Sequence, residues 1–427
     1  MMGGKKYLNI PPRMPWVLMY VFSNIVGASI MLVTGNLIGD STGGLVHSNV
    51  TLLWATALLV FSYIFMLVPV FNFVWRIRVK TTQFRMSDDI LGKRIGIFLF
   101  ILQVGYILFN YLNGVNVAGS IEKTDSSLSV FFVLVPADAL FLIYYGVFRE
   151  HRYFYPNLLV WMASNLMRGW SGVFLFIVFF EWCRGIRNKK ITLFALISGL
   201  LLLLFIYPAL LNIKMAIRAA GNDGLSFNEI VSIGAATFAE GDFFSLAADG
   251  IFSLVGRVQI ASVLVEVIRL KDVLQSEFMN GGFSPFWLEG LHGVVLDRLT
   301  GGTSISIAAK FPEYANFPGN FELGQWNTNI GYVGWFFIAP ILIPQYLLYT
   351  FLLASLSVFL TKKISNKNSA GDMIWIAWAV YLLAPWLNVF VTFVYALILF
   401  YFLKMFFSIS LKPAAQPLLI ENSQVDL

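Results

Sequence analysis

Four arginines are placed where a guanidinium group could bind a phosphorylated ligand. Arg168 interrupts one long apolar run, and Arg257 lies inside another. A charge within an apolar run points to function, and the forked N–H donors of arginine match phosphate oxygens. The structural alternatives are a side chain that snorkels to the interface for Arg168 and a solvated charge on an amphipathic helix for Arg257. Arg298, which could instead pair with Asp297, and Arg218, which could be solvated, complete the group.

A second group of residues could transfer a proton. Glu240 and Asp242 stand on either side of a glycine, and His292 is the only histidine in the segment 213–328. Carboxylates and imidazoles are the usual general bases, although a single histidine is more often a structural hydrogen-bonding group. Asp138 lies within an apolar run, where a carboxylate indicates either a functional site or a bond to a neighbouring helix.

No motif for a metal or a nucleotide cofactor accompanies these residues. The three histidines, His47, His151 and His292, are far apart in the sequence, and Cys183 is the only cysteine. A zinc site needs several such ligands at a characteristic spacing. A phosphate-binding glycine loop, a dinucleotide fingerprint and a nucleophile triad are also missing from the sequence. We therefore expect chemistry that uses neither a metal nor a cofactor.

The composition places these residues in a membrane protein. Of the 427 residues, 58% are hydrophobic and 12% are charged, whereas soluble domains have roughly 25% charged residues. A soluble fold of this length could not hide so much apolar surface, so we expect a bilayer as its solvent. The net charge of +6 does not indicate nucleic acid as a partner, because the Lys and Arg residues form short clusters between apolar runs.

The apolar runs predict an all-α fold with about ten transmembrane helices. Six runs approach the ~20 residues needed for one crossing: 15–36, 52–74, 95–117, 128–148, 191–212 and 333–360. Two longer runs, 154–183 and 372–408, are predicted to form helical hairpins. The first is expected to break at Arg168 and the second near Pro385. An even number of crossings places both termini on one side.

The basic residues orient the predicted helices through the positive-inside rule. Of the 29 Lys and Arg residues, 20 fall in the N-terminus, the C-terminal tail and every second loop. The remaining short loops hold only Lys123 and Arg168. Both termini are therefore predicted to be cytoplasmic, and the segment 213–328 to lie on the outer side.

The segment 213–328 separates an N-terminal helix bundle (1–212) from a C-terminal part with the last helices and the tail (329–427). It carries twelve acidic and seven basic residues. Its aromatic and aliphatic content argues against disorder, so we expect a folded cap over the outer mouth of the bundle. Its stretch 250–268 is apolar enough to span, but Arg257 would be costly at the bilayer centre. An interfacial or re-entrant helix is predicted there instead.

This organisation resembles that of the Wzy-type oligosaccharide repeat-unit (O-antigen) polymerases and the GT-C-type fold of polymerases and ligases. The shared features are many membrane helices, a cytoplasmic N-terminus, a basic residue at an outer turn, and one large outer loop before the last helices. Short segments that look like those of the family are 252–257, with Arg257, 281–284, 296–298, with Arg298, 322–326 and 329–334.

The resemblance implies a metal-independent glycosyltransferase in the bacterial inner membrane. Such enzymes transfer a growing glycan from undecaprenyl pyrophosphate to a new lipid-linked repeat unit at the periplasmic face, and a chain-length regulator is a further expected partner. The leaving pyrophosphate needs arginines and the acceptor hydroxyl needs a base. The expected pyrophosphate-binding residues are Arg168, Arg257, Arg298 and Arg218, and the expected bases are Glu240, Asp242 and His292.

Three other functions remain open at this point. An O-antigen ligase, which transfers glycan to lipid A-core, would share this topology. A lipid-oligosaccharide flippase or transporter usually shows two related halves with charges near the bilayer midplane, and the sequence shows no such halves. A membrane assembly factor without enzymatic activity is the fourth reading.

Overall fold

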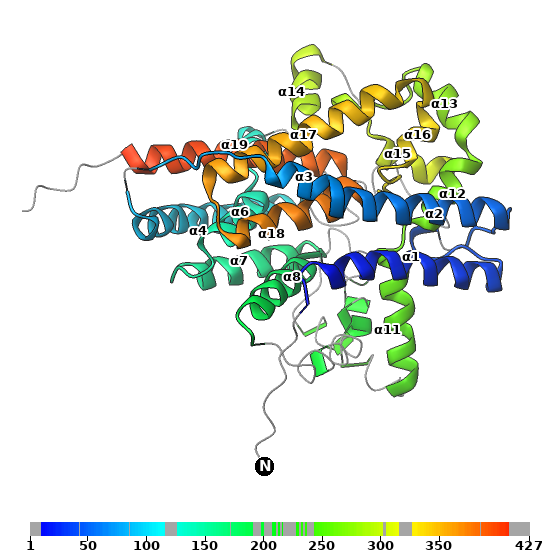
Figure 1. The fold of residues 1–427 in the computed structure, drawn as a ribbon, viewed down its shortest axis with the longest axis horizontal. Helices are drawn as coiled ribbons and strands as arrows, with labels where there is room; N and C mark the ends of the chain where they lie inside the picture. The colour runs from blue at the N-terminus through cyan, green and yellow to red at the C-terminus, as the bar shows by residue number, and fades with distance from the viewer. Residues whose placement is uncertain are drawn as a thin grey trace, which may run out of the picture.

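A computed structural model of the chain shows a bundle of helices, several of which run side by side (Figure 1). The described residues are 10–41, 43–84, 86–115, 126–170, 172–190, 243–301, 305–315, 327–384 and 386–409, with scattered residues between 198 and 236. Within these residues there is no strand, only one isolated bridge between Asn36 and Leu45. The predicted all-α fold is confirmed for this part of the chain.

Six helical segments of the described chain are long and apolar enough to cross a membrane. They are Met14–Thr34 (α1), Asn49–Arg76 (α2, η2 and α3), Asp88–Asn113 (α4), Ser127–Phe148 (α5 and α6), Pro340–Ile364 (η5 and α17) and Leu387–Ile409 (α19). They contain 21 to 28 residues. At about 1.5 Å per residue, this length is enough to cross a hydrocarbon core of about 30 Å. The chain is therefore a helical membrane protein.

Three of these segments are composite. The first consists of Asn49–Phe65 (α2), the π-helical turn Met66–Val70 (η2) and Phe71–Arg76 (α3). The second consists of Ser127–Leu134 (α5) and Ala137–Phe148 (α6). The third consists of Pro340–Leu342 (η5) and Ile343–Ile364 (α17). Each irregularity contains or adjoins a proline, namely Pro69, Pro136 and Pro340. Proline cannot donate a backbone hydrogen bond, so the regular helix is interrupted at these points.

The other predicted crossings are shorter than a full span or lie largely outside the described residues. The helices concerned are Phe154–Met167 (α7), Gly172–Arg187 (α8), Asn368–Ala377 (α18) and the π-helical Trp378–Leu383 (η6). The two breaks occur where the sequence predicted them, after Met167 and after Leu383. However, α7 packs mainly against α4 and α6, and α8 against α18, so residues 154–183 do not form a hairpin packed on itself. The predicted span 191–212 falls mostly outside the described residues.

The described part of the segment 213–328 is largely helical. Its elements are Phe243–Val258 (α11), Ala261–Arg269 (α12), Lys271–Met279 (α13), Phe286–Leu288 (η4), Leu291–Thr300 (α14) and Ile307–Tyr314 (α15). The predicted interfacial or re-entrant helix is bent by 49° between α11 and α12. At the break, the Asn24 side chain of α1 accepts a hydrogen bond from the Ile260 N–H at 3.0 Å. Helix α12 then packs against α2 and Gly334–Ile338 (α16), so this segment shares the core of the bundle.

The predicted inner loops meet at one end of the bundle, which we call the basic end. The Lys362 ammonium donates to the Ile77 carbonyl oxygen at 2.8 Å, and Lys367 pairs with Asp88 at 3.2 Å. These contacts join the connection between α3 and α4 to the connection between α17 and α18. The starts of α4 and α18 and the end of α17 are therefore neighbours.

A buried carboxylate ties further segments to the basic end. Asp372 of α18 is 1% exposed and pairs with Arg13, which precedes α1, at 2.9 Å. It also pairs with Arg187 at the end of α8. Nearby, Arg184 pairs with Glu150 at 2.9 Å. The basic loops thus share one end of the bundle, as the positive-inside rule requires of loops on one side of a membrane.

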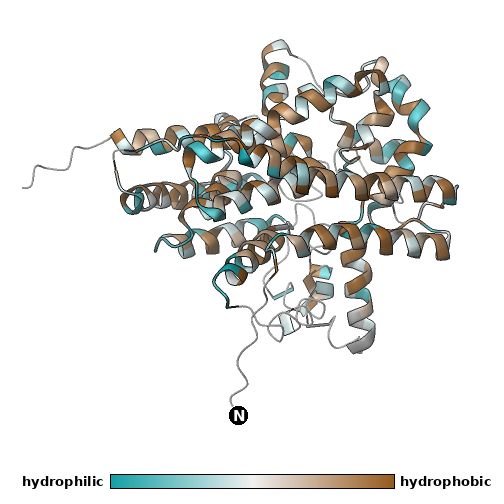
Figure 2. Cartoon of the chain, in the orientation of Figure 1, coloured by the Kyte–Doolittle hydropathy of each residue, from teal (hydrophilic) through white to brown (hydrophobic). Residues whose placement is uncertain are grey.

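The interior and the outside of the bundle differ in the way expected of a membrane protein. Every residue from Leu140 to Phe148 in α6 and from Ala370 to Ala377 in α18 is buried. On other helices, large apolar side chains are exposed, among them Phe22, Trp54 and Phe61. Figure 2 shows hydrophobic residues along the helices and hydrophilic residues at helix ends and on α13. The exposed apolar faces are the surfaces that lipid would cover.

Candidate functional site

Arg168 forms an ion pair inside the bundle. Helix α7 ends at Met167, and Gly169, with φ of 71°, adopts the left-handed conformation that turns the chain. The Arg168 side chain is 3% exposed, and its Nη2 lies 2.6 Å from Oδ2 of Asp138 in the first turn of α6. The arginine and the intramembrane carboxylate that the sequence singled out separately are therefore partners.

Several other groups fix the Arg168 guanidinium. Its Nε donates to the Ser164 carbonyl oxygen at 3.0 Å, and its Nη1 donates to the Tyr106 hydroxyl at 3.3 Å. The guanidinium also stacks 4.6 Å from the centroid of the Trp170 ring. The Asp138 side chain is 31% exposed, so the carboxylate is the accessible member of the pair. A buried guanidinium with a hydrogen bond from each of its three nitrogens suits an electrostatic or positioning role better than direct capture of a large anion.

Arg257 lies elsewhere and is more accessible. It ends α11 and pairs with Asp40 in the turn Gly39–Ser41 (η1) at 2.8 Å, with 39% of its side chain exposed. The turn can approach α11 this closely because residue 39 is glycine. A side-chain carbon there would clash with the Gly256 carbonyl oxygen, at a distance of 2.3 Å. One of the five N–H groups of this guanidinium donates to Asp40, so it retains further donors for a ligand.

The remaining predicted site residues are spread over the molecule. His292 and Arg298 are exposed on α14, and the His292 ring bonds to the Trp287 carbonyl group. Helices α14 and α11 lie at opposite edges of the bundle in Figure 1, so Arg298 and Arg257 do not share a site. The other candidates lie outside the described residues: Arg218, Glu240 and Asp242.

The sequence interpretation missed a buried carboxyl group at Glu289. This residue is 8% exposed, and no described residue bonds to its Oε1. Burial raises the pKa of the Glu289 carboxyl from its ordinary value to about 8. A group with such a pKa can gain and lose a proton near neutral pH, which is the requirement for acid–base catalysis. The available signal was an acid between Leu288 and Gly290 in an otherwise apolar stretch.

Aromatic side chains surround the position of Glu289. It follows η4, whose Phe286 ring lies 5.0 Å from Tyr346 and 5.7 Å from Tyr349 of α17. The next residue, Gly290, packs against Val391 of α19. Val391 and Lys404, which belongs to the basic end, are 13 residues apart on α19. This separation corresponds to roughly 20 Å along the helix. Glu289 thus lies in the half of the bundle away from the basic end.

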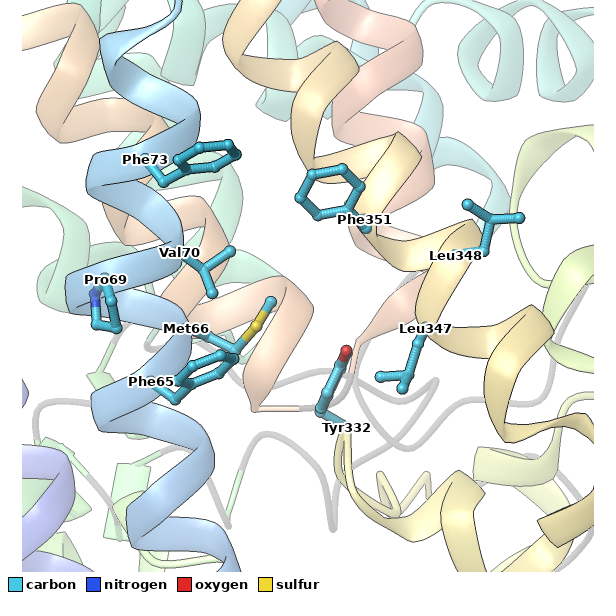
Figure 3. A pocket seen from close by; sticks show the side chains of 9 residues that line it. All are labelled: Phe65, Met66, Pro69, Val70, Phe73, Tyr332, Leu347, Leu348 and Phe351. Atoms are coloured by element: carbon cyan, nitrogen blue, oxygen red, sulfur yellow. The ribbon is translucent and has the colours of Figure 1, made fainter.

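The same aromatic cluster borders an apolar groove of about 530 Å³. The Tyr346 ring lies 5.3 Å from Tyr332, whose side chain lines the groove. Figure 3 shows the groove between the η2 region on one side and α17 on the other, with side chains such as Met66, Val70 and Phe351 directed towards the space between them. These side chains are Phe65, Met66, Pro69, Val70, Phe73, Tyr332, Leu347, Leu348 and Phe351. Both walls belong to candidate membrane spans, so a hydrocarbon chain is a natural occupant.

The described residues include no group of three or more His, Cys, Asp or Glu side chains that could hold a metal ion. The groups that these residues offer for chemistry are the buried Glu289 carboxyl, the exposed guanidinium groups of Arg257 and Arg298, and the apolar groove. No family model, curated protein or solved structure matches this chain.

Proposed function

We propose that this protein is a glycosyltransferase that polymerises oligosaccharide repeat units linked to undecaprenyl pyrophosphate. The observation that carries the proposal is the buried Glu289 carboxyl, which follows an aromatic cluster (Phe286, Tyr346 and Tyr332) that reaches the apolar groove. A lipid-linked acceptor needs this combination, because its tail is hydrocarbon and its reacting end is a sugar hydroxyl. The exposed Trp287 ring, next to Phe286, also suits the apolar face of a sugar ring.

The reaction assigns different roles to the charged residues. As general base, Glu289 accepts the proton of the acceptor hydroxyl while that oxygen attacks the anomeric carbon of the donor. The bond from that carbon to the lipid pyrophosphate breaks, and the pyrophosphate leaves with the bonding electrons. Arg298, exposed on the helix that begins two residues after Glu289, stabilises the leaving group, and Arg257 and Arg218 remain further candidates. Arg168 holds Asp138 and the ends of α6 and α7 in place. Glu240, Asp242 and His292 are alternative bases.

The proposal includes ten crossings, with both termini in the cytoplasm of a bacterial cell. Helix α8 ends at the basic end, and the next helix described in full is α11, which packs against α1 and η1. We assign the crossing between them to the apolar run 191–212, which is long enough for one span. Glu289 would then act in the periplasmic half of the membrane.

Purified full-length protein, mixed with an undecaprenyl-pyrophosphate-linked repeat unit, tests the proposal. We expect a ladder of products separated by one repeat. The rate should rise as the pH approaches about 8, because Glu289 must lose its proton to act as a base. Glu289→Gln should lower the rate roughly 10²–10⁴-fold and remove this pH dependence.

The leaving-group arginine is tested in the same assay. Arg298→Ala should lower the rate by about 10²–10³-fold, as expected for a lost donor to a leaving anion. Arg152→Ala, an exposed arginine at the basic end, is the matched control and should leave the rate unchanged. Folded protein that yields no ladder from the correct substrate would exclude the polymerase. A product transferred once to lipid A-core, without a ladder, would identify a ligase.

Interrupted helices favour a transporter as the second candidate. The span containing Pro69 has a π-helical turn, and the span containing Pro136 is broken next to the buried Asp138–Arg168 pair. Transporters often place broken helices and intramembrane charges at their substrate sites. Movement of a lipid-linked oligosaccharide across proteoliposomes that contain the pure protein, without elongation, would support this function.

A further inference from the structure

A second cavity, of about 350 Å³, lies at the basic end and is separate from the apolar groove. This volume falls within the usual range for small-ligand sites. Three parts of the chain line it: five residues before and at the start of α4, the four residues 364–367 from the end of α17 onwards, and Lys404 of α19. The five residues are Thr81, Thr82, Phe84, Met86 and Asp88. The lining combines hydroxyl, amide and charged groups with Phe84, Met86 and Ile364.

Lys404 brings a buried cation to this cavity. Its side chain is 2% exposed and lies over the Phe84 ring, 4.4 Å from the centroid. The ammonium donates to the Ile364 carbonyl oxygen at 3.1 Å, and its distance to the Asp88 carboxylate is 3.7 Å. An ammonium group has three N–H donors, and the contact with Asp88 is too long to be a strong hydrogen bond. Lys404 therefore retains capacity for an anion.

The cavity has an excess of positive charge. Lys367 lies 3.2 Å from Asp88, so the single carboxylate is shared between two ammonium groups. The Asp88 side chain is 57% exposed and can turn towards water, whereas Lys404 cannot. A phosphate oxygen entering the cavity would meet Lys404 and Lys367, with the Ser365 and Thr82 hydroxyl groups as further polar neighbours.

Backbone and side-chain bonds hold the walls in position. The Thr82 N–H donates to the Lys363 carbonyl oxygen at 3.1 Å, and the Thr82 hydroxyl is 3.2 Å from the Tyr401 hydroxyl. The Asn366 side chain bonds to Thr81 across the same gap. The connection between α3 and α4 is thus fixed against α17 and α19, and the cavity is part of the folded structure.

The depth of the cavity in the bundle matches the level of lipid headgroups. Asp88 is the first residue of α4, Ile364 is the last residue of α17, and Lys404 lies five residues before the end of α19. All three helices are candidate spans, so their ends lie near the headgroup region of the membrane. Basic pockets between membrane helices at this depth bind anionic headgroups.

We infer that this cavity binds the phosphate group of an anionic phospholipid. The site goes beyond the proposed glycosyl transfer, because it contains neither Glu289 nor any residue of the apolar groove. The phosphodiester oxygens would bind the ammonium groups of Lys404 and Lys367, and the acyl chains would remain among the surrounding lipids. The bound lipid would join the three segments that line the cavity.

Native mass spectrometry of the full-length protein in detergent tests this site with phosphatidylglycerol as the probe. Lys367→Gln should weaken binding about fivefold, the value that corresponds to one lysine near a lipid phosphate. Lys404→Met should weaken it by about tenfold, provided that its thermal unfolding profile matches that of the wild type. Lys363→Gln is the matched control, since it removes a charge from the same turn without lining the cavity.

The outcomes separate a lipid site from other sources of anion binding. The inference would be supported if phosphatidylglycerol binds more tightly than phosphatidylcholine, and if Lys367→Gln weakens phosphatidylglycerol binding while Lys363→Gln does not. Equal weakening in both variants would overturn it, because the lysines would then act only through surface charge. Displacement of the lipid by millimolar inorganic phosphate would also overturn it, since free phosphate would then be the ligand.

Discussion

Asp372 and Glu289 are both buried carboxyl groups, but their surroundings differ. Asp372, at the basic end, is 1% exposed and accepts bonds from Arg13 and Arg187. Glu289, in the other half of the bundle, is 8% exposed, and its Oε1 has no hydrogen-bond partner among the described residues. Asp372 is thus paired with two cations. Burial raises the pKa of the Glu289 carboxyl to about 8.

This difference separates a structural role from a chemical one. Asp372 joins the residues before α1, the end of α8 and the start of α18, so its ion pairs hold three segments together. Glu289 holds no segment through a described hydrogen bond, but its proton is exchangeable near neutral pH. We therefore expect substitutions at Asp372 to affect stability and substitutions at Glu289 to affect proton transfer.

The largest effect on stability is expected for Asp372→Asn. Removal of the carboxylate leaves Arg13 and Arg187 without their anion, and breaking such a pair costs about 3–5 kcal/mol. The variant should unfold at a lower temperature and accumulate less in the membrane. Glu150→Gln is the control, because the Glu150 side chain is 76% exposed and its pair with Arg184 should contribute little. Equal stability of both variants would contradict a structural role for Asp372.

A smaller effect is expected at the Arg168–Asp138 pair. Arg168→Gln should destabilise the protein by about 2–3 kcal/mol, because it leaves Asp138 unpaired while that carboxylate is only partly exposed. Adding Asp138→Asn to Arg168→Gln should recover part of this loss. Chemical denaturation of the two single variants and of the double variant can measure the recovery. Losses that simply add would indicate that the two residues do not act as a pair.

The smallest effect is expected for Glu289→Gln, and its sign depends on pH. The folded-state pKa of about 8 exceeds the unfolded value near 4.5, so the folded protein retains a proton that the unfolded chain releases. The free energy of unfolding of the wild type should therefore decrease as the pH rises from the unfolded-state pKa towards the folded-state pKa. The decrease should be about 2 kcal/mol from pH 5 to pH 7. Glu289→Gln should not show this decline. The pH dependence of the thermal unfolding midpoint measures the difference, and parallel curves for both proteins would refute it.

The local features of the fold were predictable from the sequence. The helical breaks at Arg168 and near Trp386 follow from polar and proline residues within apolar runs, and both coincide with helix ends. Helix lengths were harder to predict, because α7 and α8 have only 14 and 16 residues. A hydropathy pattern does not distinguish a full span from a shorter helix buried among others.

The candidate site was only partly predictable. Arg168 and Asp138 were identified separately, but their pairing was not, because 30 residues separate them in the chain. Arg257 was identified without Asp40, its partner 217 residues away. Glu289 was missed because it is distinguished by a buried carboxyl oxygen to which no described residue bonds. Neighbouring residues in the sequence do not reveal this property, because it depends on which side chains the fold places around the carboxyl group.

The sequence by itself therefore determined the class of protein, the approximate course of its helices and the side on which its basic loops gather. These features depend on the composition of short segments and on their transfer from water to a bilayer. Only the tertiary structure decided which carboxyl groups have partners: Asp372 pairs with residues 359 and 185 positions earlier, whereas the Oε1 of Glu289 has no partner in the part of the chain that the structure describes. The physical reason is that burial and ion pairing act through space, between residues that the chain order keeps far apart.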